Sequence, residues 1–356
     1  MSFIKSILIA IVICLCVTNC ETRTDISTSV VKDFVPRNYY GAKLEPVTKV
    51  LHGAGQCYWN NSVQEYLQML QGKYDPVIIN DYITVRVLKK GTDAFIHNIR
   101  NWLAKFPSYT MFQLGLALGA PEKEGGPFKD LTENVASGAY DDTLNYLFNA
   151  LNTLNVPVYI RIGYECNGSW NHYATDSYKR AYRHVTNLLR SSILNNNSAS
   201  IWCIASDGSS AYMDWYPGDQ FVDWWAIDLF RATGLTSNLT KSFLSDADQH
   251  QKPVMIGESS ASYTGVSGGQ ASWDNWFEPY FELIRNNPGI KAFNYINWEW
   301  DSKRRQGWRD SRIGKNGLVA ALYAHEMASP LFLHASTKET VMDSLKSAEP
   351  EGSVIR

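Results

Sequence analysis

The chain has 356 residues, of which 45% are hydrophobic and 19% are charged. This composition supplies enough apolar material for a large core and carries too little charge for a disordered protein. The formal net charge is -2, so the chain lacks the basic field that would attract nucleic acid, and nucleic acid is excluded as a partner. The length fits one large domain or two average ones.

Residues 1–20 are predicted to form a signal peptide. Lys5 precedes an apolar run from Ile7 to Val17, and a polar stretch follows Cys20. A run of about 11 apolar residues suits a signal-peptide core and is too short to span a bilayer. We therefore expect a secreted protein without a membrane span, in which residues 21–38 form an N-terminal extension. Lipid anchoring at Cys20 is the less favoured alternative.

Cysteines and histidines give no pattern for a metal or a disulfide framework. Beyond Cys20 only Cys57, Cys166 and Cys203 remain, so at most one bridge can form. The seven histidines lie far apart, without His-x-x-x-His or Cys-x-x-Cys spacing, and no Gly-rich phosphate loop follows an apolar run. The sequence thus predicts no metal and no cofactor.

Short apolar runs alternate with amphipathic stretches over residues 39–331, which is typical of repeated βα units. The apolar runs predict eight strands, at Lys49–His52, Pro76–Tyr82, Met111–Leu118, Pro157–Ile162, Ser200–Ala205, Val222–Leu229, Pro253–Gly257 and Lys291–Asn297. The stretches between them predict helices at Val63–Leu70, Ala94–Phe106, Asp142–Asn155, Asp176–Leu194, Ser242–Gln249, Trp273–Asn286 and Gly317–Met327. Residues 207–220 look irregular.

Eight strands of this kind indicate a single-domain (β/α)8 TIM barrel. Each run is nearly continuously apolar, as expected for a strand that is buried on both faces, and eight is the number that closes such a barrel. No linker, low-complexity tract or repeat divides residues 39–331. Residues 332–356 are polar and are predicted to be a frayed tail. We expect a monomer.

Two carboxylates follow apolar runs at the positions where such a barrel carries its reactive groups. Glu165 follows the fourth predicted strand and Glu258 the seventh. These strands face each other across a barrel, so the pair could lie on either side of one glycosidic bond, where hydrolysis needs one acid and one carboxylate. The alternative is that both are rim carboxylates, paired with Arg161 or Lys252.

Three segments resemble glycoside hydrolase family 26, the β-mannanases and their relatives. The segment around Glu165 is similar to the acid/base motif of that family and reads Arg161-Ile-Gly-Tyr164-Glu165-Cys-Asn167-Gly168-Ser-Trp170. Trp202 and residues 215–230 resemble the fifth and sixth strands of the family, and residues 252–259 resemble its nucleophile strand. The likeness covers about residues 156–258 and implies a distant member of the (β/α)8 retaining glycosidase clan.

The resemblance implies that Glu165 is the acid/base and Glu258 the nucleophile of a double displacement. Position within the matched motifs or at strand ends adds candidate substrate-binding residues, which are Arg161, Tyr164, Asn167, Trp170, Asp228, Trp298, His52 and Tyr82. Arg161 could hydrogen-bond Glu258. For His52 a structural histidine is an equal alternative, and Trp298 could instead be a core residue that plugs the barrel.

The chain departs from the family pattern at three places. Tyr164 stands where the family has His, Phe230 replaces a Tyr that hydrogen-bonds the nucleophile, and Glu299 stands where Arg can occur. Phenylalanine donates no hydrogen bond, so Glu258 would lose an orienting partner unless Tyr295 or another hydroxyl supplies it. These departures affect the choice of substrate more than the mechanism.

The resulting prediction is a secreted glycoside hydrolase that cleaves a β-linked polysaccharide. The preferred substrate is β-mannan, cleaved in the manner of an endo-β-mannanase; the alternatives are a β-1,3/1,4-glucanase, a β-1,3-xylanase or a catalytically silent glycan-binding barrel. The polysaccharide is the only partner predicted. The basic loop Lys303–Arg312 either meets anionic substrate groups or is neutralised by Glu299, Asp301 and Asp310, and the second interpretation is favoured.

Overall fold

The computed structural model describes residues 34–56, 62–106, 108–122, 126–303 and 305–345. The predicted signal peptide, most of the N-terminal extension, Cys20 and Cys57 lie outside these residues. Among the described helices, none combines the length and the apolar character that a bilayer crossing requires.

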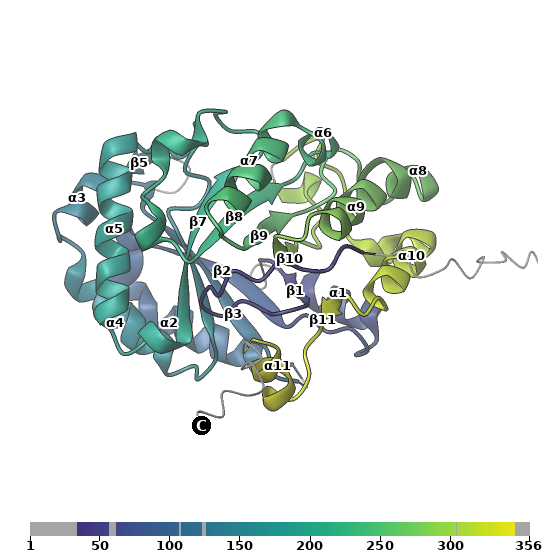
Figure 1. The fold of residues 1–356 in the computed structure, drawn as a ribbon, viewed down its shortest axis with the longest axis horizontal. Helices are drawn as coiled ribbons and strands as arrows, with labels where there is room; N and C mark the ends of the chain where they lie inside the picture. The colour runs from purple at the N-terminus through teal and green to yellow at the C-terminus, as the bar shows by residue number, and fades with distance from the viewer. Residues whose placement is uncertain (1–33, 57–61, 107, 123–125, 304, 346–356) are drawn as a thin grey trace, which may run out of the picture. The chain divides into compact units, whose positions relative to one another are not determined.

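Eight parallel strands form a closed barrel (Figure 1). They are β1 Val50–Ala54, β2 Ile78–Thr84, β3 Met111–Ala117, β6 Val158–Ile162, β7 Ser198–Ala205, β8 Trp224–Leu229, β9 Val254–Ser259 and β10 Ile290–Tyr295. Each strand pairs with the next in this order, and β10 pairs with β1 to close the ring. The predicted (β/α)8 barrel is confirmed, and each predicted strand overlaps an observed one, with bounds that differ by up to two residues.

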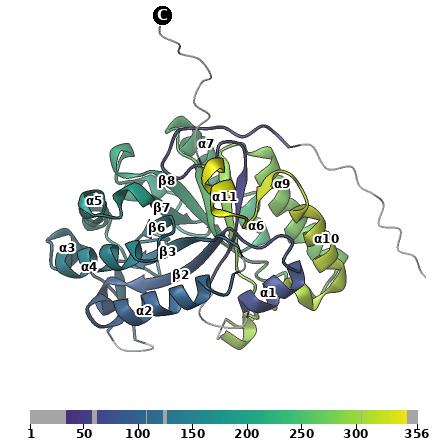
Figure 2. The same cartoon turned by 90° about the horizontal axis from the view of Figure 1, so that it is seen from below.

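Helices surround the strands, as Figure 2 shows from below. The longer ones are α1 Ser62–Leu70, α2 Leu88–Leu103, α4 Asp141–Asn152, α5 Thr175–Ser191, α7 Asn238–Gln249, α9 Glu278–Asn286 and α10 Gly317–Met327. Short helices are α3 Thr132–Ala136, α6 Ala232–Leu235 and α8 Gln270–Ser272. The predicted helix at Trp273–Asn286 begins with a π-helical turn before α9, and residues 207–220 hold only two 3-10 turns.

The amphipathic pattern of α5 shows how the helices attach to the barrel. Tyr178, Ala181, Tyr182, Val185 and Leu189 are all buried and recur at a spacing of three or four residues. This spacing gives the helix one apolar stripe, which packs against the strands while the opposite face stays polar. The helix thereby holds the strand before it, β6, and the loop that carries Glu165.

Side chains alternate between two cores because successive residues of a strand point to opposite faces. Leu51, Ile78, Met111 and Trp224 belong to a cluster inside the barrel. Their neighbours pack outward against the helices in a second and larger cluster. Both faces of each strand are therefore buried, which is why the sequence shows continuous apolar runs.

A buried ion pair lies at the amino ends of the strands, opposite the predicted site. Lys291 Nζ donates to Val47 O at 3.0 Å and lies 3.6 Å from Glu45 Oε1, and both side chains are fully buried. Glu45 also accepts hydrogen bonds from the backbone N–H groups of Tyr40 and Ala42. Burial lowers the pKa of Lys291 to about 8. The pair fixes residues 38–47 across this end of the barrel.

Removing the lysine should destabilise the barrel. Lys291→Met leaves the Glu45 carboxylate buried without a cation, and breaking a buried pair in this way costs about 3 kcal/mol or more. We expect the free energy of unfolding in urea at pH 7 to fall by that amount. The double variant Lys291→Met/Glu45→Gln removes the stranded charge and should recover part of the loss. A single variant within about 0.5 kcal/mol of the wild type would contradict the assignment.

The prediction that the chain frays after residue 331 is wrong for the described part of the tail. Strand β11, Phe332–Leu333, pairs in parallel with β1, and helix α11, Lys338–Ser344, follows it. Leu333 and Val341 join the interior cluster of the barrel. The segment folds because Leu333, Val341 and Leu345 pack on the interior cluster and Phe332 packs on the outer one.

Candidate active site

A cavity of about 750 Å³ opens at the carboxyl ends of the strands. Glu165 and Glu258, the two predicted catalytic residues, both line it. The other lining residues are Gln56, Tyr82, Tyr164, Trp170, Asn171, Asp207, Phe230, Tyr263, Trp298, Trp300, Arg305 and Trp308. Of the predicted substrate-binding residues, the cavity thus includes Tyr82, Tyr164, Trp170 and Trp298. Aromatic walls around two carboxylates suit the apolar faces and hydroxyls of a sugar.

Glu165 lies in a tight turn directly after β6. Its backbone has φ 51° and that of Gly163 has φ 58°, both in the left-handed region. Glycine is required at 163, because a Cβ there would lie 2.7 Å from the ring of Tyr178. Trp170 Nε1 donates to Glu165 Oε2 at 2.7 Å. The turn and the tryptophan together hold the carboxyl group at the cavity wall.

The environment of Glu165 favours its protonated form. The pKa of Glu165 is raised to about 7, first by burial and second by the negative charge of Glu258. The hydrogen bond from Trp170 acts in the opposite direction but does not cancel the effect. A carboxylic acid that stays protonated up to neutral pH can donate a proton to a leaving group.

Glu258 is held by a buried arginine. Arg161 Nη1 donates to Glu258 Oε1 at 2.8 Å, and Nη2 donates to Asp228 Oδ2. Asp228 is paired with Glu258 across the β8–β9 register, and Arg161 reaches both from the opposite strand β6. At Gly257 a Cβ would lie 2.9 Å from Arg161 Nε, so the glycine makes room for the guanidinium. Glu258 therefore has a fixed orientation and a positive charge beside it.

The structure changes the predicted role of three residues. Arg161 and Asp228 are fully buried behind Glu258 and do not line the cavity, so they position the carboxylate instead of binding substrate. Asn167 donates to the carbonyls of Ala205 and Ser209 and accepts from Ala205 N–H. The side-chain amide thus uses its hydrogen bonds to hold the end of β7 and the loop after it. The prediction that Asn167 contacts substrate is wrong.

The prediction that His52 lines the site is also wrong. Leu51 belongs to the interior cluster, so strand alternation turns His52 outward to the helices. There its Nε2 lies 2.6 Å from Tyr66 Oη of α1, and its Nδ1 lies 3.0 Å from His334 Nδ1. His52 is therefore a structural histidine. Neighbouring residues of a strand point to opposite faces, so the residue after the inward-facing Leu51 points to the helices.

Sequence reasoning missed half of the aromatic wall, namely Phe230, Tyr263, Trp300 and Trp308. Trp300 packs on Trp298 and Trp308 with ring centroids 5.1 Å apart in both cases, and Tyr263 packs on Trp308 at 5.6 Å. Phe230 contacts Trp308 at 5.3 Å and so contributes an apolar surface. The available signal was the density of tryptophan in residues 298–308, directly after the last strand.

The hydroxyl of Tyr295, which the sequence offered as a partner for Glu258, does not reach that carboxylate. Its Oη donates to Ser311 O at 2.7 Å within the helix-facing core. The hydroxyl of Tyr82 is buried at the cavity instead, and within the described residues it has no hydrogen-bond partner. Arg161 is therefore the orienting partner that the structure gives to Glu258.

The basic loop is only partly neutralised. Arg312 forms an ion pair with Asp310 at 2.7 Å, as the favoured interpretation predicted. Arg309 Nη1 lies 3.4 Å from Thr264 O. Arg305 lines the cavity, with its guanidinium 4.5 Å from the Trp308 ring centroid. Arg304 and the side chain of Lys303 lie outside the described part of the chain.

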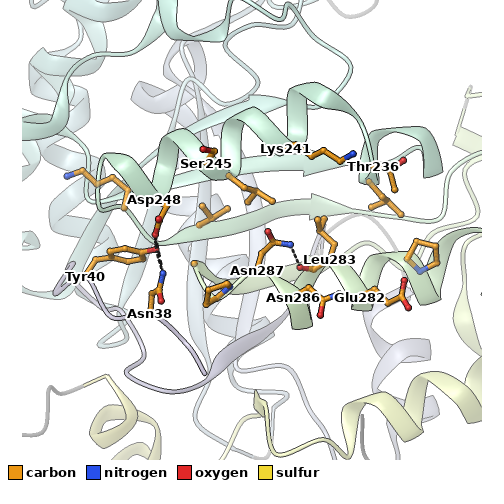
Figure 3. A pocket seen from close by; sticks show the side chains of 17 residues that line it. Asn38, Tyr40, Thr236, Lys241, Ser245, Asp248, Glu282, Leu283, Asn286 and Asn287 are labelled. Atoms are coloured by element: carbon orange, nitrogen blue, oxygen red, sulfur yellow. Dashed lines mark hydrogen bonds between the residues drawn. The ribbon is translucent and has the colours of Figure 1, made fainter. Parts of the chain in front are cut away.

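A separate pocket of about 550 Å³ lies between α7 and α9 on the outside of the barrel (Figure 3). Neither Glu165 nor Glu258 lines it. Tyr40 Oη and Asn38 Nδ2 both donate to Asp248 Oδ1, at 2.6 and 3.1 Å. Asn287 Nδ2 donates to the carbonyl of Leu283. These polar groups satisfy one another, so the pocket shows no reactive arrangement.

Within the described residues, no three His, Cys, Asp or Glu side chains come close enough together to hold a metal ion. Cys166 and Cys203 are both buried free thiols. Cys203 Sγ accepts a hydrogen bond from Arg161 Nη2 at 3.2 Å.

The pKa of Glu165 predicts the alkaline limb of the pH profile. A group that must be protonated loses function as the pH rises through its pKa, so kcat/KM should fall above about pH 7, tenfold per pH unit. Steady-state rates from pH 4 to 9 measure this limb. An activated aryl glycoside needs little protonation at the first step, and its limb should be smaller. A rate that stays flat to pH 9 would contradict the assignment of the acid.

Comparison with known proteins supports the likeness seen in the sequence. Residues 108–247 match the family model of glycosyl hydrolase family 26. The chain is 31% identical over 233 residues to a beta-1,3-xylanase of Alcaligenes sp, which covers 58% of this chain and 50% of that protein. It is 30% identical over 232 residues to beta-1,3-xylanase TXYA of Vibrio sp, with 57% and 50% covered. The chain spans about half the length of these relatives.

Solved structures share the same barrel. GH26C from Muricauda sp. MAR_2010_75 has a TM-score of 0.61 at 16% identity, covering 82% of this chain and 88% of that one. The Bacillus subtilis mannanase man26 has a TM-score of 0.56 at 17% identity, covering 83% and 90%. At these identities the likeness establishes the fold.

Proposed function

We propose that this distant relative of glycosyl hydrolase family 26 hydrolyses β-1,3-linked xylan with retention of anomeric configuration. The observation that carries the proposal is the pair of glutamates in one aromatic-lined cavity, held in different environments. Burial raises the pKa of Glu165 to about 7, whereas Glu258 is hydrogen-bonded to the Arg161 guanidinium. An acid and a fixed carboxylate are the two groups that glycoside hydrolysis needs.

In the first step Glu258 attacks the anomeric carbon while Glu165 protonates the glycosidic oxygen. The carbon–oxygen bond breaks, the leaving chain departs as an alcohol, and an ester forms between the sugar and Glu258. In the second step the Glu165 carboxylate takes a proton from water as that water attacks the anomeric carbon. The ester bond breaks, Glu258 is released as a carboxylate, and Glu165 is again protonated.

The substrate assignment rests on the relatives at 30% and 31% identity, both named as β-1,3-xylanases. The mannanase structure is only 17% identical, so it supports the barrel and not the sugar. The β-mannan preferred from the sequence stays a prediction and belongs in the same test. We also propose export through residues 1–20, since a xylan polymer lies outside the cell; N-terminal sequencing of protein recovered from the medium tests this.

The substrate test compares three polymers with the purified chain. β-1,3-Xylan, β-1,4-mannan and mixed-linked β-1,3/1,4-glucan are incubated separately, and reducing ends are measured over time. We expect β-1,3-xylan to be cleaved at least tenfold faster than the others. Faster release from mannan or glucan would replace the substrate assignment. Binding of a polymer without cleavage of any would favour a glycan-binding barrel and overturn the proposed activity.

A further inference from the structure

A second pocket of about 430 Å³ adjoins the candidate active site at the ends of β2 and β3. Tyr82 and Tyr164 line both cavities, and their ring centroids are 5.4 Å apart. The remaining lining residues are Asp81, Ile83, Thr84, Val87, Gly91, Phe95, Asn98, Ala117, Gly119, Ala120, Pro121 and Phe128. A group in this pocket would therefore lie against the same two tyrosines as a sugar chain in the cleft.

The far wall of the pocket is a fixed hairpin. Strands β4, Gly119–Pro121, and β5, Phe128–Asp130, pair in antiparallel register. Thr84 Oγ1 donates to Gly119 O at 2.9 Å, which ties the hairpin to the end of β2. A Cβ at Gly119 would lie 2.3 Å from the Phe128 ring, so glycine lets this ring lie flat on β4. The apolar wall is thus built from specific contacts.

Asp81 is the unusual member of this lining. It is only 2% exposed, and within the described residues it makes no ion pair. Its Oδ1 accepts a hydrogen bond from Tyr82 N–H at 2.8 Å. Burial raises its pKa to about 7. A buried carboxyl group without a cation is costly in an apolar setting, so a ligand that donates a hydrogen bond to it would be favoured.

The lining excludes a sugar ring as the natural occupant. A buried sugar needs a partner for each hydroxyl, but of the fourteen lining residues only Asp81, Thr84 and Asn98 carry polar side chains besides the two tyrosines. Thr84 already donates to Gly119 O. Phe95 of α2 and Phe128 of β5 instead offer flat apolar surfaces to the pocket, which suit a planar group with few polar atoms.

From this we infer that the pocket binds an ester-linked aryl substituent of the polysaccharide, with its ring against Phe95 and Phe128 and a phenolic hydroxyl on that ring donating a hydrogen bond to Asp81. The inference rests on the proposed function for the polymer that carries the substituent. The pocket itself can be tested with a small ester, so its failure is distinguishable from a failure of the proposed hydrolysis.

The binding test uses methyl 4-hydroxycinnamate and isothermal titration calorimetry on the full chain. Ala120→Trp fills the pocket and should abolish binding. Asp81→Leu removes the hydrogen bond and should weaken binding about tenfold, which corresponds to about 1.4 kcal/mol. Asp81→Asn keeps a hydrogen-bonding group of the same size and should stay within threefold of the wild type. Near-UV circular dichroism checks that each variant is folded.

Trp308→Ala is the matched control, because this residue lines the active-site cavity and not the second pocket. It should leave the affinity for the ester unchanged while weakening the binding of an unsubstituted β-1,3-xylo-oligosaccharide. Loss of ester binding in Trp308→Ala, with retention in Ala120→Trp, would show that the ester binds in the cleft and would overturn the inference. No binding by the wild type would overturn it as well.

The kinetic test compares a xylan that carries aryl esters with the same polymer after mild alkaline removal of the esters. We expect the wild type to show at least a fivefold higher kcat/KM on the esterified polymer, and Ala120→Trp to lose this preference while keeping its rate on the de-esterified one. Equal preference in both proteins would contradict the inference. Activity on neither polymer, together with intact ester binding, would count against the proposed function alone.

Discussion

Glu258→Ala should lower kcat by a factor on the order of 10⁵ and leave the affinity for β-1,3-xylan within about threefold. The substitution removes the carboxylate proposed to attack, while the aromatic wall of Trp298, Trp300 and Trp308 remains. Reducing-end release measures the loss of turnover, and calorimetry with an oligosaccharide measures binding. Glu282→Gln changes a carboxylate that lines the outer pocket between α7 and α9 and should keep full activity.

A residual rate in Glu258→Ala above about one per cent of the wild type would remove Glu258 from the role of nucleophile. Loss of binding together with turnover would point instead to a collapsed cavity. The cavity could collapse because Arg161, which pairs with both Glu258 and Asp228 in the wild type, would keep only Asp228 as a partner. Thermal unfolding of the variant distinguishes the two cases.

Glu165→Ala should separate the two chemical steps. An activated aryl glycoside needs little protonation, so its first step should stay within about tenfold of the wild type, whereas the second step should slow on the order of 10³-fold because water is no longer activated. A burst of the aryl alcohol followed by slow turnover is the expected time course. On xylan, whose leaving group is poor, both steps should be slow.

Azide should restore the second step in Glu165→Ala. The truncated side chain leaves space beside the wall formed by Trp170, and a small anion needs no general base to attack the ester on Glu258. The product should be a glycosyl azide with the β configuration. An α-glycosyl azide would indicate a single displacement, and failure of azide to change the rate would argue that Glu165 is not the base.

The sequence was sufficient for the barrel and for bringing two glutamates to one cavity at its rim. Strands buried on both faces leave continuous apolar runs, so all eight strands could be predicted, and the carboxyl end of each run then identified Glu165 and Glu258 as candidates. This inference works because the barrel places every strand end at one rim. It does not depend on how the loops fold.

The errors arose where a single residue or a loop decides the contact. His52 was assigned to the cavity because the strand was predicted to end there, whereas β1 continues to Ala54 and the side chain of His52 faces α1. Asn167 lies in the matched motif, but its amide bonds to the backbone of the β7 loop, which no pattern in the sequence shows. Leu333 and Val341 fold the tail through contacts that are distant in sequence.

Trapping of the glycosyl-enzyme ester is the most direct test of the account. A 2-fluoro-substituted β-1,3-xylobioside with an activated leaving group slows both steps and lets the ester accumulate, and peptide mass spectrometry then locates the sugar. We expect one fluoro-xylobiosyl group on the peptide that contains Glu258, with fragmentation placing it on that side chain, and no label in Glu258→Gln. A label on Glu165 or Asp207 would contradict the assignment of Glu258 as the nucleophile. Steady turnover of xylan by a protein that never acquires a label would contradict the double displacement.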